Sequence, residues 1–262
     1  MLRSTLGTFI AVTALVLPLT ANALPVMPDF ADAPSGWVTD RYDPHSFANA
    51  GTVHGRDNVL AIGIHRDEGF SARAPAYQST FYNTQGRQHA ISGGAGSVLA
   101  ADLYIDADWA SESGFGTVRT DMWGVMTDGS GVSDYPIIGF TNLGGIGRYR
   151  VWDSDTGWVD LAVGVDFGDW VSLAIELTND SFKYYVNDVL AYTDLTINGS
   201  TGFSAAIMQA YNFFGDPSIV DVNAANYTAY WSNAVAASVP EPMSLALFGL
   251  GLAGLGLRRR RI

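Results

Sequence analysis

The sequence predicts an all-β protein in which two antiparallel sheets pack face to face. Apolar and polar residues alternate with a period of two through ten segments, which is the pattern of half-buried strands. Clusters of Gly, Asn, Asp and Ser separate these segments and indicate turns. Between residues 24 and 238 no segment keeps a helical period for more than two turns. About ten strands in one domain are expected to divide into two packed sheets.

The clearest of the expected strands is the segment 171–178. There Val171, Leu173, Ile175 and Leu177 share one face, and the residues between them share the other. No internal repeat and no Pro/Ser-rich linker interrupts the chain, so one domain is expected over residues 24–238. In chain order, the expected strands are 59–66, 77–83, 97–106, 118–126, 136–142, 147–153, 171–178, 181–188, 202–209 and 226–233.

Two stretches define the sandwich further. The stretch "GDWVSLAIELTNDSFKYYVNDVLAYTD" at 168–194 contains a Trp-led strand, a tight turn, an aromatic-rich strand and a second turn. It resembles the concanavalin A-like jelly roll of laminin G domains, lectins and glucanases, and "NYTAYWSNAV" resembles the closing strand of that fold. The resemblance implies a jelly-roll sandwich. Asp188 stands where many relatives have Gly, but Asp tolerates a positive φ better than most residues, so the hairpin is expected to survive.

The N-terminus has the pattern of a secretory signal peptide. Arg3 is the sole charge before an apolar run over 6–19, and Ala21 and Ala23 give the small-x-small cleavage pattern. Residues 1–23 are therefore expected to be removed after export by the Sec machinery. A retained N-terminal anchor is the alternative.

The C-terminus combines a Pro-Glu-Pro motif, an apolar segment and a run of arginines. About fifteen apolar or small residues would form a helix of roughly 22 Å, shorter than the roughly 30 Å of a bilayer core. Such a length suits a sorting element, and a plain membrane tail is the alternative. The arginines would hold the last residues on the cytoplasmic side. The sorting residues are Val239, Pro240, Glu241, Pro242, Arg258, Arg259, Arg260 and Arg261.

This order resembles the PEP-CTERM sorting signal over residues 239–262. The resemblance implies recognition by an exosortase in a Gram-negative bacterium that makes extracellular polysaccharide. It also implies transient insertion of the short helix in the inner membrane and cleavage near Val239–Pro242. The body would then be released or attached at the cell surface.

The body of the chain is strongly acidic. The chain has 14 Lys and Arg and 26 Asp and Glu; without Arg3, the arginines of 258–261 and Glu241, 9 cationic and 25 acidic side chains remain, a balance of −16. Such a surface repels phosphate, which excludes nucleic acid as a partner, and it is compatible with cations and neutral glycans. The chain has no Cys, which excludes disulfides, zinc–thiolate sites and Cys nucleophiles.

Catalytic motifs are not visible in the sequence, and no enzymatic activity is expected. Glucanases of this fold use two carboxylates at even spacing on one strand, whereas Glu68, Glu112 and Glu176 each lack a second Glu nearby. No G-x-S-x-G elbow is present, and the four His show no zinc-binding spacing.

Calcium is the expected cofactor, if one is bound. "DSDTGWVD" places Asp153, Asp155 and Asp160 around one turn, and calcium prefers clustered hard oxygens. The alternative is a plain turn in which Asp side chains accept bonds from nearby backbone N–H groups.

Aromatic residues crowd into 123–158 and suggest a carbohydrate site. In "GRYRVWDS" the residues Arg148, Arg150 and Trp152 share one face, and aromatic faces stack on sugar rings. With Trp123 and Trp158 they form the expected binding set; the alternative is that these aromatics fill the core.

Together these features predict an exported surface or matrix protein that binds exopolysaccharide without cleaving it. One alternative is a glycan-cleaving hydrolase or lyase on the same fold. The other is a structural or adhesive matrix protein without a small ligand.

Overall fold

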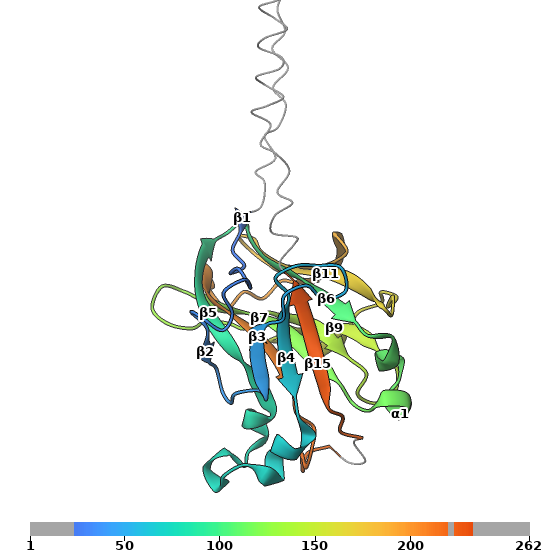
Figure 1. The fold of residues 1–262 in the computed structure, drawn as a ribbon. Coiled ribbons are helices and arrows are strands. Elements are labelled where there is room, and N and C mark those ends of the chain that lie inside the picture. The colour runs from blue at the N-terminus through green and yellow to red at the C-terminus, as the bar shows by residue number, and fades with distance from the viewer. Residues whose placement is uncertain (1–23, 220–222, 233–262) are drawn as a thin grey trace, which may run out of the picture.

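The protein is a two-layered antiparallel β-sandwich, which confirms the predicted fold class (Figure 1). The computed structural model describes residues 24–219 and 223–232. One sheet runs in the order β13-β12-β11-β6-β15-β4-β3, with β1 added in parallel beside β6. The other runs β10-β9-β8-β7-β14-β5-β2. The predicted signal peptide and sorting segment lie outside the described residues.

The eight-stranded sheet contains β1 (Leu24–Pro25), β3 (Ser46–Asn49), β4 (Leu60–Ile64), β6 (Ser97–Ile105), β11 (Asp169–Leu177), β12 (Phe182–Val186), β13 (Val189–Asp194) and β15 (Tyr227–Ser232). The seven-stranded sheet contains β2 (Val38–Thr39), β5 (Thr84–Gly94), β7 (Arg119–Thr127), β8 (Ile137–Thr141), β9 (Arg148–Asp153), β10 (Gly157–Asp160) and β14 (Gly202–Tyr211). The helical segments are η1 (Arg66–Glu68), η2 (Phe70–Ala72), η3 (Pro75–Tyr77), η4 (Thr80–Asn83), η5 (Ala107–Ala110) and α1 (Glu112–Phe115).

The core lies between the two sheets and is filled by the faces that the alternation predicted. In β11 every second side chain from Val171 to Leu177 is buried in it, as are the inward residues of β6, β12 and β15. Burying one face of each strand removes apolar area from water at roughly 25 cal/mol per Å². The opposite faces lie on the outside of the sandwich, where many side chains of β7, β8 and β14 are also buried.

The hairpin between β12 and β13 forms despite the missing glycine. Asn187 and Asp188 have φ values of 49° and 63°, the left-handed pair required by a two-residue type I′ turn. Val186 pairs directly with Val189 across this turn. The expectation for Asp188 is confirmed.

The segment 77–83 differs from the prediction. It forms 3₁₀ turns, because Pro75 starts η3 and the Ser79 hydroxyl caps η4 by accepting the Phe81 N–H at 3.3 Å. The strand follows at once as β5, whose sequence "TQGRQHAISGG" lacks an apolar period. These short helices gather at one end of the sandwich, at the bottom of Figure 1.

Candidate functional site

The outer face of the seven-stranded sheet carries the candidate site. Met122, Ile138, Val151 and Met208 point into the core from four adjacent strands. Their neighbours in sequence therefore project from the opposite face. The strand registers arrange these outward side chains in rows that run across the sheet.

The first row is aromatic and apolar. Each residue of this row pairs directly with the next one on the neighbouring strand. Together the residues of the row belong to a hydrophobic cluster that is separate from the core. The indoles of Trp152 and Trp158 meet edge to face with centroids 5.3 Å apart, and both are partly exposed. The aromatic row consists of Trp158, Trp152, Ile137, Trp123 and Ile207.

The second row is polar and largely buried. At its centre the Asp121 carboxylate, which has no exposed surface, accepts bonds from Arg119 Nε and Gln209 Nε2, both at 2.6 Å. The other carboxylate oxygen of Asp121 and the side-chain oxygen Oε1 of Gln209 are buried without a partner. The polar row consists of Asp160, Arg150, Gly139, Asp121 and Gln209.

Gly139 makes room for the central carboxylate. A Cβ at Gly139 would lie 2.3 Å from Asp121 Oδ1 and 2.3 Å from the Thr120 carbonyl oxygen. No side chain fits there without moving β7 or β8. The polar row therefore depends on this glycine.

Arg119 and Arg150 both lie against the face of Trp158. Their guanidinium carbons are 4.6 Å and 3.7 Å from the ring centroid. Arg148, at the start of β9, pairs with Asp160 at 2.8 Å. The edge strand β10 thus supplies an indole that covers the arginines and a carboxylate that binds one of them.

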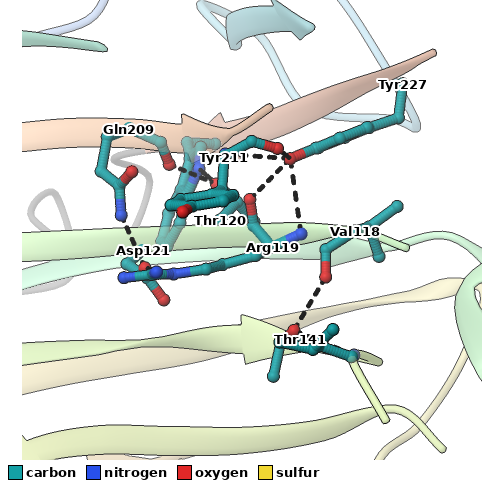
Figure 2. A network of polar contacts seen from close by, with 10 residues as sticks. Val118, Arg119, Thr120, Asp121, Thr141, Gln209, Tyr211 and Tyr227 are labelled. Carbon is teal, nitrogen blue, oxygen red and sulfur yellow. Dashed lines mark hydrogen bonds and ion pairs between the residues drawn. The ribbon is translucent and has the colours of Figure 1, made fainter. Parts of the chain in front are cut away.

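Two side chains of the other sheet fix β7 and β14 beneath these rows. The Tyr227 hydroxyl enters where the two strands separate; it accepts the Tyr211 N–H at 3.0 Å and lies 2.8 Å from the Arg119 carbonyl oxygen, which it can donate to (Figure 2). Trp231 Nε1 donates to Thr120 Oγ1 at 3.0 Å, and the Thr120 hydroxyl in turn donates to the backbone carbonyl oxygen of Gln209. Burial raises the pKa of the Tyr227 phenol well above its ordinary value. The phenol therefore stays protonated, and the core fixes the position of the polar row.

Arg150 is in an unusual electrostatic position. It is only 6% exposed, and its Nε and Nη2 atoms have no hydrogen-bond partner. Burial, and secondly the charge of Arg119, lower the pKa of Arg150 to about 9. A guanidinium in this state is short of an anionic acceptor.

The structure brings the predicted carbohydrate-binding residues together. Trp123, Trp152, Trp158, Arg148 and Arg150 all lie on this outer face, on β7, β9 and β10. Sequence analysis missed Arg119, Asp121, Gln209 and Tyr211. Extending the alternation of β7 backwards from Trp123 would have found two of them, because Asp121 and Arg119 occupy the same face.

The predicted calcium ligands are placed differently. Asp153 Oδ1 accepts the backbone N–H groups of Asp155 and Thr156, both at 2.9 Å, which is the turn alternative. Asp160 lies on the outer face and pairs with Arg148. Among the described residues no group of three or more His, Cys, Asp or Glu side chains is arranged to hold a metal. Calcium stays a prediction from the sequence.

Comparison with known proteins identifies the C-terminal segment. Residues 238–261 match the PEP-CTERM protein-sorting motif, which confirms the resemblance noted in the sequence. The motif marks an exported protein directed to the cell surface by exosortase-dependent sorting. Within the described part of the chain no helix is long and apolar enough to cross a membrane. A search of curated proteins finds no match.

Solved structures share the sandwich at low sequence identity. A β-glucanase of Bacillus licheniformis is 15% identical, with a TM-score of 0.44 over 78% of this chain and 92% of that one. A β-1,3-1,4-glucanase (lichenase) from a mouse hindgut metagenome is 11% identical, with a TM-score of 0.46 over 78% and 94%. The carbohydrate-binding module CBM66 of Bacillus subtilis is 14% identical, with a TM-score of 0.35 over 67% and 91%.

The expectation that the protein has no enzymatic activity is wrong, because glucanases are among the structures with this fold. That expectation relied on the missing glutamate pair. The outer face nevertheless holds a fixed carboxylate at Asp121, which the search for paired glutamates did not consider. The likeness itself is one of fold.

Proposed function

We propose that the protein is an exported polysaccharide-active protein that binds a glycan chain on the outer face of its seven-stranded sheet. The observation that carries the proposal is an aromatic row, in which Trp152 and Trp158 are partly exposed, beside a polar row whose edge carries the exposed carboxylate of Asp160. Aromatic faces stack on sugar rings, and neighbouring polar side chains bind hydroxyl groups. The rows cross several strands, which suits an extended chain.

Sorting supports the same role. After Sec export and removal of residues 1–23, the short C-terminal helix would anchor the protein transiently in the inner membrane. Exosortase would then cut near Val239–Pro242 and place the sandwich among the extracellular polysaccharide of a Gram-negative cell. A polysaccharide partner is consistent with that destination.

Affinity electrophoresis through a panel of polysaccharides tests the binding proposal. We expect at least one polymer to retard the protein, and Trp158→Ala to weaken that binding about fivefold, equivalent to about 1 kcal/mol of stacking. Trp170→Ala is the matched control, because Trp170 lies on β11 of the other sheet. Retardation by no polymer, or an equal loss in both variants, would refute binding at this face.

Cleavage of the bound chain is the second candidate function, and the position of Asp121 favours it. Its carboxylate oxygen Oδ1 has no hydrogen-bond partner, but it is buried, so a substrate would reach it only after the side chains that cover it move. The next carboxylate on the row, Asp160, lies three strands away, about 14 Å at 4.8 Å per strand, too far for a paired mechanism. Tyr211, whose ring is 5.0 Å from the Arg119 guanidinium, donates its hydroxyl proton to Asp216 Oδ2 at 2.7 Å. Burial, with the bond to Asp216, raises the pKa of Tyr211 to about 12 and keeps it protonated.

Release of new reducing ends from a retarding polymer measures cleavage. We expect Asp121→Asn to abolish release while leaving retardation within about threefold, since the amide keeps the shape of the carboxylate. Release that persists in Asp121→Asn would remove this residue from the chemistry. No release by the wild-type protein from any retarding polymer would leave binding as the function.

A further inference from the structure

The outer face of the seven-stranded sheet concentrates the few cations of this acidic protein. Of the 9 cationic side chains in residues 24–238, four lie on or over it. Arg41 reaches it by stacking on Trp123 at 4.5 Å. Their charges act on one another, because Arg119 lowers the pKa of both Arg41 and Arg150 after the larger effect of burial. We call Arg41, Arg119, Arg148 and Arg150 the arginine cluster.

Three carboxylates pair with the four side chains of the arginine cluster, so one arginine is left without a paired anion. Asp40 lies 3.3 Å from Arg41, Asp121 2.6 Å from Arg119, and Asp160 2.8 Å from Arg148. Two nitrogens of Arg150 make no hydrogen bond, and the carboxylates of Asp121 and Asp160 act on its charge without pairing with it as they pair with Arg119 and Arg148. Leaving a buried charge without a partner is costly, so the site is incomplete without another anion.

We infer that the ligand of this face is an acidic polysaccharide, whose carboxylate groups bind the arginine cluster while its sugar rings stack on the aromatic row. The inference rests on the proposed function and names the class of glycan. A guanidinium fork matches a carboxylate in geometry as well as charge. A uronic acid unit would supply both the missing anion and the ring.

Access to the cluster is available from the edge of the sheet. The side chains of Arg119 and Arg148 are 12% and 28% exposed. The indole that covers Arg150 belongs to β10, which has β9 as its single neighbour in the sheet. A change of side-chain rotamer at Trp158 would open Arg150 to a bound carboxylate.

The net charge of the body opposes the binding of a polyanion. A body with a balance of −16 repels polyanions at long range, so composition favours neutral glycans. Binding of a polyanion therefore requires a local site. Non-specific electrostatic attraction would therefore not produce binding of an acidic polymer to this protein.

The test compares two polymers with one backbone: polygalacturonate and its fully methyl-esterified form. The full-length chain, in neutral detergent at low ionic strength, is run by affinity electrophoresis through each. We expect the acid form to bind at least about tenfold more tightly, and Arg150→Gln to reduce that preference to about twofold. Arg66→Gln is the charge-matched control, because Arg66 is about half exposed and lies outside the cluster, 4.8 Å from the Phe214 ring.

Arg148→Gln is the second variant, because Arg148 is more exposed and its loss disturbs folding less. Retention of the tenfold preference in both folded variants would overturn the inference, as would equal binding of the two polymers. In those cases a glycan still binds and the proposed function stands. Retardation by no polymer, acidic or neutral, would refute the proposed function itself.

Discussion

Strand β9 has a cluster of arginines at one end and a cluster of aspartates at the other. The two clusters differ in how their charged side chains find hydrogen-bond partners. The first residue of β9, Arg148, belongs to the arginine cluster, and its last residue, Asp153, lies beside three further carboxylates. We call Asp134, Asp153, Asp155 and Asp194 the aspartate cluster. Both clusters crowd equal charges into a partly buried site, yet their hydrogen-bond partners differ.

The aspartate cluster is saturated by its own chain. Tyr192 donates to Asp153 Oδ2 at 2.6 Å, Asn198 donates to Asp134 Oδ2 at 2.8 Å, and the Thr196 N–H donates to Asp194 Oδ1 at 2.7 Å. The arginine cluster instead leaves buried nitrogens of Arg150 without acceptors. We infer that the aspartate cluster, whose hydrogen bonds are made within the chain, stabilises the fold. The arginine cluster, whose buried donors lack acceptors, is the one suited to bind a ligand.

Breaking the centre of the outer face gives the largest expected effect. Asp121→Ala leaves Arg119 and Gln209 buried without their shared acceptor, so we expect a loss of about 3 kcal/mol in the free energy of unfolding. Urea denaturation measures it. Asp67→Ala is the control, because Asp67 is 73% exposed and lies 4.0 Å from Arg66; equal effects would show that the central pair is not special.

Closing the space beneath Asp121 gives the next largest effect. Gly139→Ala adds a methyl group 2.3 Å from the carboxylate, and we expect it to cost about 2 kcal/mol through displacement of β8. Gly131→Ala is the control, since nothing lies within 4 Å of its Cβ position. Thermal melts compare the two, and matching melting temperatures would contradict the tight packing described for the polar row.

The sequence predicted the sandwich because one dry face imposes a period of two on each strand. Val171 to Leu177 had to alternate, since one side of β11 meets the core and the other does not. The strand β5 escaped prediction because buried polar residues such as Gln85 stand where apolar ones were expected. Its pairing with β14 is a tertiary effect that no local pattern records.

The site was predicted only in its aromatic part. Trp123, Trp152 and Trp158 stand out by residue type, whereas Asp121 and Gln209 gain their meaning from contact. They are 88 residues apart and meet through the register of β7 with β14. No spacing along the chain encodes that register.

Alkaline pH distinguishes the arginine cluster from ordinary surface charge. The pKa of Arg150 is lowered to about 9, so its cationic fraction falls about tenfold between pH 7 and pH 10. The groups that face it are Arg119 and Asp121 on β7, Arg148 on β9 and Asp160 on β10. Binding of polygalacturonate should therefore weaken about fourfold over this range, slightly less than the roughly fivefold loss expected for Arg150→Gln.

The methyl-esterified polymer provides the control for alkaline pH, since its binding does not depend on the cation. In Arg150→Gln the pH dependence between 7 and 10 should flatten. A constant affinity of the wild-type protein for polygalacturonate from pH 7 to pH 10 would show that this guanidinium does not bind the ligand.

A smaller effect is expected when one charge is removed from the aspartate cluster. Burial, with the charges of Asp153 and Asp134, raises the pKa of Asp194 to about 6. Because the folded pKa is raised, the protonated group contributes stability that is fully present below about pH 4 and is lost as pH rises through 6. Asp194→Asn should therefore stabilise the protein at pH 7 by about 1 kcal/mol, discounted for solvent screening, and have no such benefit at pH 4.

Thermal melts of Asp194→Asn at the two pH values measure that difference. Asp180→Asn, in an exposed turn, is the control and should change stability equally little at both. Destabilisation of Asp194→Asn at pH 7 would mean that the charge itself is needed in the cluster.

Calcium gives the smallest expected effect and tests whether the aspartate cluster is as complete as its hydrogen bonds indicate. The oxygens of Asp153 already accept from Tyr192 and two backbone N–H groups, and Thr196 donates to Asp155. A cation would have to displace these donors, so we expect a Kd of about 1 mM or weaker and, at about 1 mM calcium, at most about 0.4 kcal/mol of stabilisation. That corresponds to about 1 °C in the Tm of an EDTA-treated sample. A shift of several degrees that Asp194→Asn abolishes would instead establish a calcium site, and both ends of β9 would then be built for a ligand.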